Sequence, residues 1–176
     1  TSGNDLQDFL NRPRPHIDES PVFRFMRALI SCDKPVVAAV TGPAIGIGTT
    51  MLLHCDLVYV ADEARLSMPF AALGLVPEFG SSLIVPRLMG GRRAAEKLLH
   101  GDPFTAETAV ECGIANAVLP ANEVLPHARR IAEAIATAFD YVGVLAVEMF
   151  VVAEGGRQAL LVNEIAPRVH NSGHWT

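Results

Sequence analysis

The chain has 176 residues, enough for one domain with a substantial core, and half of its residues are apolar. Its formal net charge of −5 gives no electrostatic reason to bind nucleic acid or an anionic membrane surface. The three cysteines, Cys32, Cys55 and Cys112, are odd in number and lack CxxC spacing, which predicts a reduced, cytoplasmic protein.

The first predicted elements run as far as residue 55. An amphipathic helix is predicted from Pro21 to Cys32, because its apolar residues form one helical stripe: Val22, Phe23, Met26, Leu29 and Ile30. Residues 35–55 carry no charge and are long enough to suggest a membrane span, but three glycines and Pro43 interrupt them. A buried strand, a glycine loop and a buried helix explain this segment better.

Strands and helices continue to alternate as far as about residue 125. Strands are predicted over 56–62, 64–69 and 115–120, and helices over 92–100, with Gly101 as its stop, and 105–112. This alternation predicts a layered α/β fold. After residue 125 the pattern changes: a helix from Pro126 is followed by strands over 142–152 and 158–166, which a short turn joins into a hairpin.

The segment Gly42–Gly48 joins a buried strand to a helix and contains three glycines. Such a turn presents backbone N–H groups beside the positive end of a helix, which suits an anion or a developing oxyanion. On the loop alone, tight packing of strand against helix is the preferred interpretation.

Four segments, in this order, resemble the crotonase superfamily and, within it, the Δ3-Δ2-enoyl-CoA isomerase branch. They are SGNDL at 2–6, KPVVAAVTGPAIGIG at 34–48, CDLVYVADEARLSMPF at 55–70 and LGLVPEFGSS at 73–82. The resemblance covers about residues 1–125 and lacks the family's N-terminal strands. It implies an incomplete crotonase-like core of stacked strands and helices, an acyl-CoA thioester partner, a role in fatty acid metabolism, no cofactor, and a homo-oligomer.

The resemblance also implies an oxyanion hole. Its two donors would be the backbone N–H groups of Ser2 and Ile47, with Gly46 and Gly48 lining the substrate-binding loop. Enolate charge builds on the thioester oxygen during the reaction, and preorganised N–H groups stabilise that charge without reorganisation.

Glu78 is the candidate acid/base residue, because it stands where the isomerase branch places its single catalytic glutamate. Hydratases of the superfamily carry two glutamates, and Thr50 and Phe70 occupy those positions here. One carboxylate is sufficient to move a proton between C2 and C4 of a 3-enoyl-CoA. The resemblance therefore implies isomerisation rather than hydration.

The neighbours of Glu78 predict its electrostatic environment. Apolar residues flank it and are expected to desolvate the carboxylate and raise its pKa: Leu75, Val76, Pro77 and Phe79. An exposed loop glutamate is the alternative interpretation. His54 and Cys55, at an apolar helix end, are interpreted as packing residues.

Residues 126–176 resemble the end of the ATP-grasp domain of carboxyaminoimidazole ribonucleotide synthetase, through YVGVLAVEMF, LLVNEIAPR and VHNSGHWT. In that family paired glutamates hold the magnesium ions of ATP, which implies metal ligands at Glu148 and Glu164. A three-residue turn over 155–157 would pair Glu154 with Gln158 and place Glu148 opposite Glu164. Facing carboxylates are unfavourable without a cation between them, although an exposed acidic pair is the alternative.

The sequence thus predicts an α/β chain of two parts, 1–125 and 126–176, joined by fusion or recombination. The leading function is crotonase-type acyl-CoA isomerisation. One alternative is ATP-dependent ligation in purine biosynthesis, with ATP and magnesium as cofactors if the second part retains its function. The other is a catalytically silent fusion of the two parts.

Overall fold

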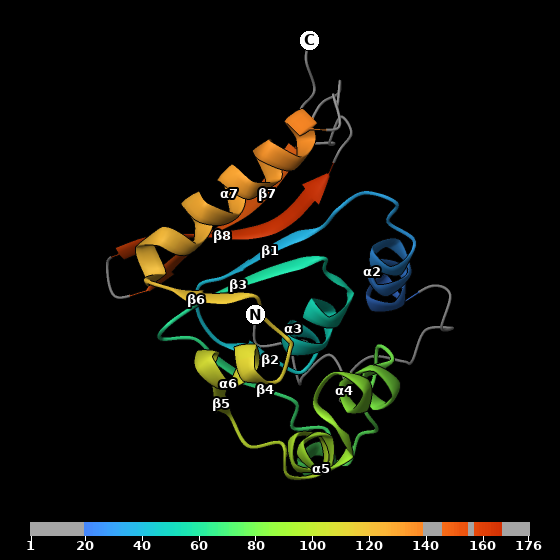
Figure 1. The fold of residues 1–176 in the computed structure, drawn as a ribbon. Helices are drawn as coiled ribbons and strands as arrows, with labels where there is room; N and C mark the ends of the chain where they lie inside the picture. The colour runs from blue at the N-terminus through green and yellow to red at the C-terminus, as the bar shows by residue number, and fades with distance from the viewer. Residues whose placement is uncertain (1–19, 139–145, 155–156, 167–176) are drawn as a thin grey trace. The chain divides into compact units, whose positions relative to one another are not determined.

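The computed structural model describes residues 20–138 and the strand backbones of 146–154 and 157–166. The chain divides into two compact units, Thr1–Ala128 and Arg129–Thr176. Figure 1 follows the elements from blue to red along the chain.

One parallel sheet lies in the first unit, in the order β1-β3-β6. Its strands are β1 (Val37–Val40), β3 (Leu57–Ala61) and β6 (Ala117–Leu119), and both pairings are parallel. The central strand is buried at four consecutive residues, from Val58 to Ala61. A continuous apolar run of this kind is typical of a parallel strand that is covered on both faces. The predictions of strands within 35–40, 56–62 and 115–120 are confirmed, but only β3 is buried along most of its length, since β6 and most of β1 are partly exposed.

A second small sheet of the first unit has the order β2-β4-β5. Its strands are β2 (Ala44–Ile45), β4 (Arg65–Ser67) and β5 (Phe104–Thr105), with β2 parallel and β5 antiparallel to β4. The strand β4 was predicted, whereas β2 lies inside the segment predicted as a glycine loop and β5 was not predicted. Two-residue strands carry no periodicity in the sequence, so only their partners reveal them.

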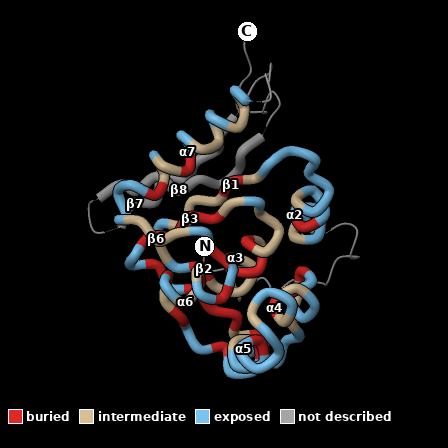
Figure 2. Tube along the Cα trace, in the orientation of Figure 1, coloured by how far each residue is buried: buried red, intermediate tan, exposed pale blue. Residues whose placement is uncertain are grey.

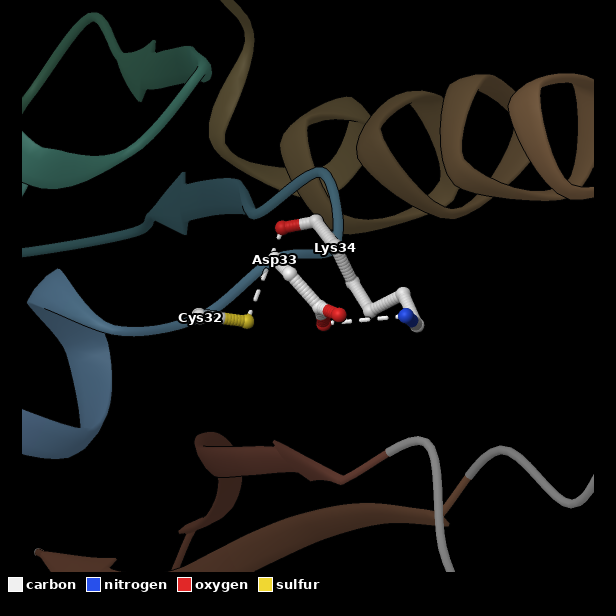
Figure 3. Close-up of polar contacts among 3 residues, drawn as sticks. All are labelled: Cys32, Asp33 and Lys34. Carbon is white, nitrogen blue, oxygen red and sulfur yellow. Dashed lines mark hydrogen bonds and ion pairs between the residues drawn. The ribbon is translucent and has the colours of Figure 1, made fainter.

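The helix α2 (Pro21–Ile30) begins at its proline, as predicted. Only part of its predicted apolar stripe is buried: Met26 is buried, while Phe23 and Ile30 are exposed. An exposed turn follows, shown in Figure 3, in which Lys34 Nζ lies 2.9 Å from Asp33 Oδ1 and the Cys32 thiol donates to the Lys34 carbonyl at 3.5 Å. The Lys34 ammonium lowers the pKa of Asp33.

The helix after the glycine loop starts earlier than predicted. The α-helix α3 (Ile47–Thr50) begins directly after Gly46, whose φ is 59°, and continues as a 3₁₀ turn, η1 (Met51–His54). Thr49 and Thr50 are both buried in it. The Thr49 hydroxyl donates to the Ala44 carbonyl and, at 3.0 Å, to the Ser67 carbonyl, which ties α3 to the second sheet.

The remaining helical elements of residues 20–138 are η2 (Ala71–Leu73), α4 (Ser81–Met89), α5 (Gly91–Ala95), the π-helical η3 (Glu96–His100), α6 (Ala106–Glu111) and α7 (Ala121–Ala138). The predicted stop at Gly101 is confirmed by its left-handed φ of 75°.

The prediction that Pro126 begins a helix is wrong. The first turn of α7 is formed by residues 121–125, where the Glu123 N–H bonds the Pro120 carbonyl at 2.8 Å, and Pro126 lies inside the helix.

The core of the first unit gathers around β3 and α3, as the red segments of Figure 2 show. Its largest fully buried apolar side chains come from several elements: Leu66, Met68, Val60, Val85 and Val124. Within the part of the chain that the structure describes, no helix has both the length and the apolar character needed to cross a membrane.

In the second unit, β7 (Ala146–Glu154) and β8 (Arg157–Ala166) pair antiparallel, as the sequence predicts. The predicted turn register is wrong, because Glu154 pairs with Arg157 rather than with Gln158. A register shift between Glu148 and Met149 then inserts one extra residue in β8, in the manner of a β-bulge. Through that shift Glu148 still pairs with Glu164, as predicted.

Candidate active site

Glu78 lies in the loop between η2 and α4, where the backbone turns sharply. The next two residues have left-handed conformations, with φ of 54° at Phe79 and 70° at Gly80. The buried residue Ser81 bonds the Glu78 carbonyl twice, through its N–H at 3.0 Å and its hydroxyl at 2.6 Å. These contacts fix the backbone of Glu78 against the start of α4.

The two carboxylate oxygens of Glu78 have different surroundings. The Thr50 hydroxyl donates a 2.6 Å hydrogen bond to Oε1. Oε2 is buried and has no hydrogen-bond partner among the described residues. Burial raises the pKa of Glu78, and the Thr50 hydrogen bond and the nearby His54 imidazole oppose this shift only in part. A carboxyl group with a raised pKa and one unoccupied oxygen is suited to general acid/base chemistry.

The predicted source of this desolvation is only partly correct. Leu75 is 44% exposed and Val76 is 81% exposed, so these side chains contribute little to burying the carboxylate. Phe79, by contrast, is 7% exposed, and Thr50 is fully buried. The pKa of Glu78 is raised by burial, as predicted, but the exposed Leu75 and Val76 are not its source, and the buried residue that contacts the carboxylate is Thr50 of α3.

Ile47 lies at the first position of α3. Among the described residues, no hydrogen bond occupies the N–H groups of Ile47 and Gly48. The Gly46 N–H, by contrast, bonds the Ser67 carbonyl at 3.0 Å, and the Gly46 carbonyl accepts from the N–H groups of Thr49 and Thr50. Gly46 thus shapes the turn through its positive φ, while the Ile47 and Gly48 N–H groups have no hydrogen-bond partner among the described residues.

The structure brings two residues to Glu78 whose contacts the sequence did not predict. Thr50 was noted only as the replacement for a glutamate, and it bonds the carboxylate. His54, interpreted as a packing residue, does stack on Phe79, but its Nε2 also lies 2.7 Å from the Phe79 carbonyl. A spacing of four residues on one helix places two side chains on the same face, and that spacing was the available signal.

Three other predicted site residues do not belong to the described part of the first unit. Ser2 is outside the described residues, and Glu148 and Glu164 belong to the second unit. In the described part of the first unit, a cavity of about 190 Å³ is lined by residues that include Cys55, Ile84 and Asn116, but not by Glu78 or Ile47. Among all described residues, no group of three or more His, Cys, Asp or Glu side chains could hold a metal ion.

The chain belongs to the enoyl-CoA hydratase/isomerase family, whose model matches residues 1–156. Enoyl-CoA delta isomerase 2 of Rattus norvegicus is 40% identical over 125 residues, covering 68% of this chain and 32% of the relative. Crotonyl-CoA hydratase of Syntrophomonas wolfei is 37% identical over 111 residues, covering 63% of this chain and 42% of the relative. Relatives named as isomerases and relatives named as hydratases therefore both match this chain.

The solved structure of Pseudomonas aeruginosa OdaA is similar to this chain, with 56% identity and a TM-score of 0.74. The match covers 78% of this chain and 56% of that one. This chain therefore spans less than two thirds of the length of each of these three relatives. The mixed α/β crotonase-like fold is confirmed, while the ATP-grasp resemblance of residues 126–176 stays a prediction.

Proposed function

We propose that this chain isomerises 3-enoyl-CoA to 2-enoyl-CoA thioesters, with Glu78 as the base. One observation carries the proposal: Glu78 has one carboxylate oxygen bound by Thr50 and the other buried without a partner among the described residues. The two positions at which hydratases of the superfamily carry glutamates are occupied by Thr50 and Phe70. A site with one carboxylate can shuttle a proton but has no second carboxylate to activate water.

In the proposed reaction, Glu78 Oε2 removes a proton from C2 of the 3-enoyl-CoA. The electron pair of that C–H bond forms an enolate, whose negative charge rests on the thioester oxygen. The double bond then moves from C3–C4 to C2–C3 as the protonated Glu78 returns the proton to C4. The raised pKa of Glu78 favours the first step, because it makes the carboxylate a stronger base. The return of the proton to C4 is driven by the strong basicity of the enolate.

The enolate oxygen requires hydrogen-bond donors, and we assign one of them to the Ile47 N–H. Support comes from its position at the start of α3, where it has no partner among the described residues. Thr50, at the other end of this four-residue helix, bonds Glu78, so one short element links the proposed donor to the proposed base. The second donor, by resemblance to the family, is the Ser2 N–H.

The proposal is tested by incubating the chain with a 3-enoyl-CoA and, separately, with a 2-enoyl-CoA, and following the conjugated thioester by its absorbance. We expect the absorbance of the conjugated thioester to rise with the 3-enoyl-CoA and to stay constant with the 2-enoyl-CoA, which should not be hydrated. Glu78→Gln should abolish turnover. The exposed Glu63→Gln serves as a control that should keep full activity. Hydration of the 2-enoyl-CoA, turnover by Glu78→Gln, or no turnover by the unmodified chain would each contradict the proposal.

ATP-dependent ligation stays the alternative that the resemblance of residues 126–176 implies; the pairing of Glu148 with Glu164 in the hairpin does not by itself indicate ATP binding. Calorimetric titration with an acyl-CoA, and separately with ATP and magnesium, separates the hypotheses. Binding of the acyl-CoA alone supports the isomerase, and binding of ATP with magnesium supports the ligase. Binding of neither supports a catalytically silent chain.

A further inference from the structure

The backbone that follows Glu78 adopts a conformation that its residue type disfavours. Phe79, with φ of 54°, is the one non-glycine residue in the described part of the chain with a positive φ. An L-residue with a Cβ is strained in the left-handed region, and such strain persists only where the surroundings impose it. The contacts of Phe79 should therefore show what holds Glu78 in place.

His54 contacts Phe79 in two ways. Its ring stacks on the Phe79 ring with centroids 4.1 Å apart and an interplanar angle of 27°. Its Nε2 lies 2.7 Å from the Phe79 carbonyl oxygen. Because a carbonyl only accepts, Nε2 carries the proton and donates it. The Phe25 ring of α2 makes an edge-to-face contact with the Phe79 ring, with centroids 6.4 Å apart, so α2 also contacts Phe79.

Thr50 and His54 act on adjacent residues of the same loop. Thr50 bonds the Glu78 carboxylate at 2.6 Å, and His54, four residues further along the α3–η1 segment, bonds the carbonyl of Phe79. One helical segment therefore hydrogen-bonds both the side chain of Glu78 and the backbone carbonyl of the next residue. The His54 imidazole is also close enough to Glu78 to favour its charged form.

We propose that His54 is a positioning residue for Glu78: by holding Phe79 in its left-handed conformation, it keeps the Glu78 carboxylate on the Thr50 hydroxyl with Oε2 unoccupied. This inference deepens the proposed function and rests on it for its catalytic consequence. His54 contacts Phe79 rather than the Ile47 or Gly48 N–H groups, so its loss should affect the reaction step more than acyl-CoA binding.

Two variants separate the two contacts of His54. His54→Phe keeps a ring for the stack and removes the donor, whereas His54→Gln keeps an N–H donor at the end of a flexible side chain and loses the stack. We expect His54→Phe to lower kcat by roughly ten- to a hundredfold, with KM within about twofold, because small displacements of a catalytic group have effects of this size. His54→Gln should recover a large part of kcat.

His127→Phe is a matched control, because the His127 ring packs on a different aromatic residue, Tyr59, with ring centroids 4.5 Å apart. This variant should leave kcat unchanged even where it lowers the melting temperature. An unchanged kcat in folded His54→Phe would overturn the inference. So would a raised KM with kcat retained, or an equal loss of kcat in His127→Phe.

A second measurement does not depend on turnover. The pKa of Glu78 can be followed by the ¹³C shift of its carboxyl carbon in the unmodified chain, Thr50→Val, His54→Phe and the double variant. If His54 keeps Glu78 on Thr50, Thr50→Val should raise this pKa in the unmodified background and change it little when His54 is already replaced. Equal effects in both backgrounds would overturn the positioning role. Failure of the proposed isomerase function would appear separately, as turnover by Glu78→Gln or no turnover at all.

Discussion

The Thr50 hydroxyl lies 2.6 Å from Glu78 Oε1, although the two residues are 28 positions apart in the sequence. By resemblance, Thr50 stands where hydratases of the superfamily carry a glutamate. A carboxylate at this position would lie beside Glu78, and two like charges at such a distance resist simultaneous ionisation. The hydroxyl instead donates to the carboxylate, so position 50 supplies a hydrogen-bond donor to Glu78 rather than a second negative charge beside it.

Replacing Thr50 with valine removes this donor and keeps the shape of the side chain. Because the hydrogen bond lowers the pKa of Glu78, its loss should raise that pKa and move the acid limb of the kcat/KM profile to higher pH. The measurement is a pH profile of 3-enoyl-CoA isomerisation. Thr49→Val is the matched control, since Thr49 is equally buried but bonds the Ala44 and Ser67 carbonyls. Equal shifts in both variants would contradict the assignment of this effect to the Thr50–Glu78 bond.

The raised pKa of Glu78 also predicts a dependence of stability on pH. Burial raises the folded-state pKa above the ordinary glutamate value of about 4. The stability that this protonated group contributes is therefore complete below about pH 4 and is lost as pH rises through the folded-state pKa. Glutamine does not ionise, so Glu78→Gln keeps its stability as the pH rises. Its melting temperature should therefore exceed that of the unmodified chain near neutral pH and approach it in acid.

Thermal unfolding between about pH 4 and 8 measures this difference, in a window set by the ordinary glutamate pKa and its upward shift. Glu63→Gln, at an exposed turn residue, provides the control for the removal of one negative charge. A constant difference between Glu78→Gln and the unmodified chain would show that Glu78 is solvated rather than buried.

Gly101 should tolerate a side chain less well than Gly74, although both have left-handed backbones. Their φ values are 75° and 66°, so alanine at either position incurs about 1–2 kcal/mol of conformational strain. A Cβ on Gly101 would also lie 2.6 Å from Pro69 Cα, whereas a Cβ on Gly74 would meet nothing within 4 Å. Gly101→Ala should therefore reduce the free energy of unfolding by a further ~1–3 kcal/mol. Denaturant titration of both variants checks this, and equal losses would show that the backbone at Pro69 gives way.

The sequence predicted the parts of the site that depend on local order. The glycine loop and the helix after it follow from residues close together in the chain, whereas Glu78 was identified by resemblance to the isomerase branch. The strand predicted over 56–62 is likewise present, as β3. Gly101 predicted the end of η3, because only glycine adopts the required backbone without strain.

The remaining features depend on contacts between segments that are distant in the chain. The donor to Glu78 and the partner of Phe79 come from residues 28 and 25 positions away. The sequence also could not show that Leu75 and Val76 face solvent, because apolar residues in a loop point wherever the turn directs them. The sequence paired Glu154 with Gln158 instead of Arg157, an error of one residue in register. The register shift between Glu148 and Met149 cancels that error, so the predicted pairing of Glu148 with Glu164 is still found.

The pairing of Glu148 with Glu164 predicts repulsion between two register positions of like charge. Glu164→Gln should therefore stabilise the chain slightly, by about 0.2–1 kcal/mol. Glu154→Gln is the matched control with the opposite sign, because Glu154 pairs with Arg157 and its neutralisation removes an attraction. Both effects should shrink at high salt, since ions screen exposed charges. Without ATP to supply phosphate ligands, two carboxylates should hold magnesium only weakly, so magnesium alone should raise the melting temperature little. A large magnesium-dependent rise that Glu164→Gln abolishes would contradict this prediction and would favour a functional ATP-grasp-like metal site in the second unit.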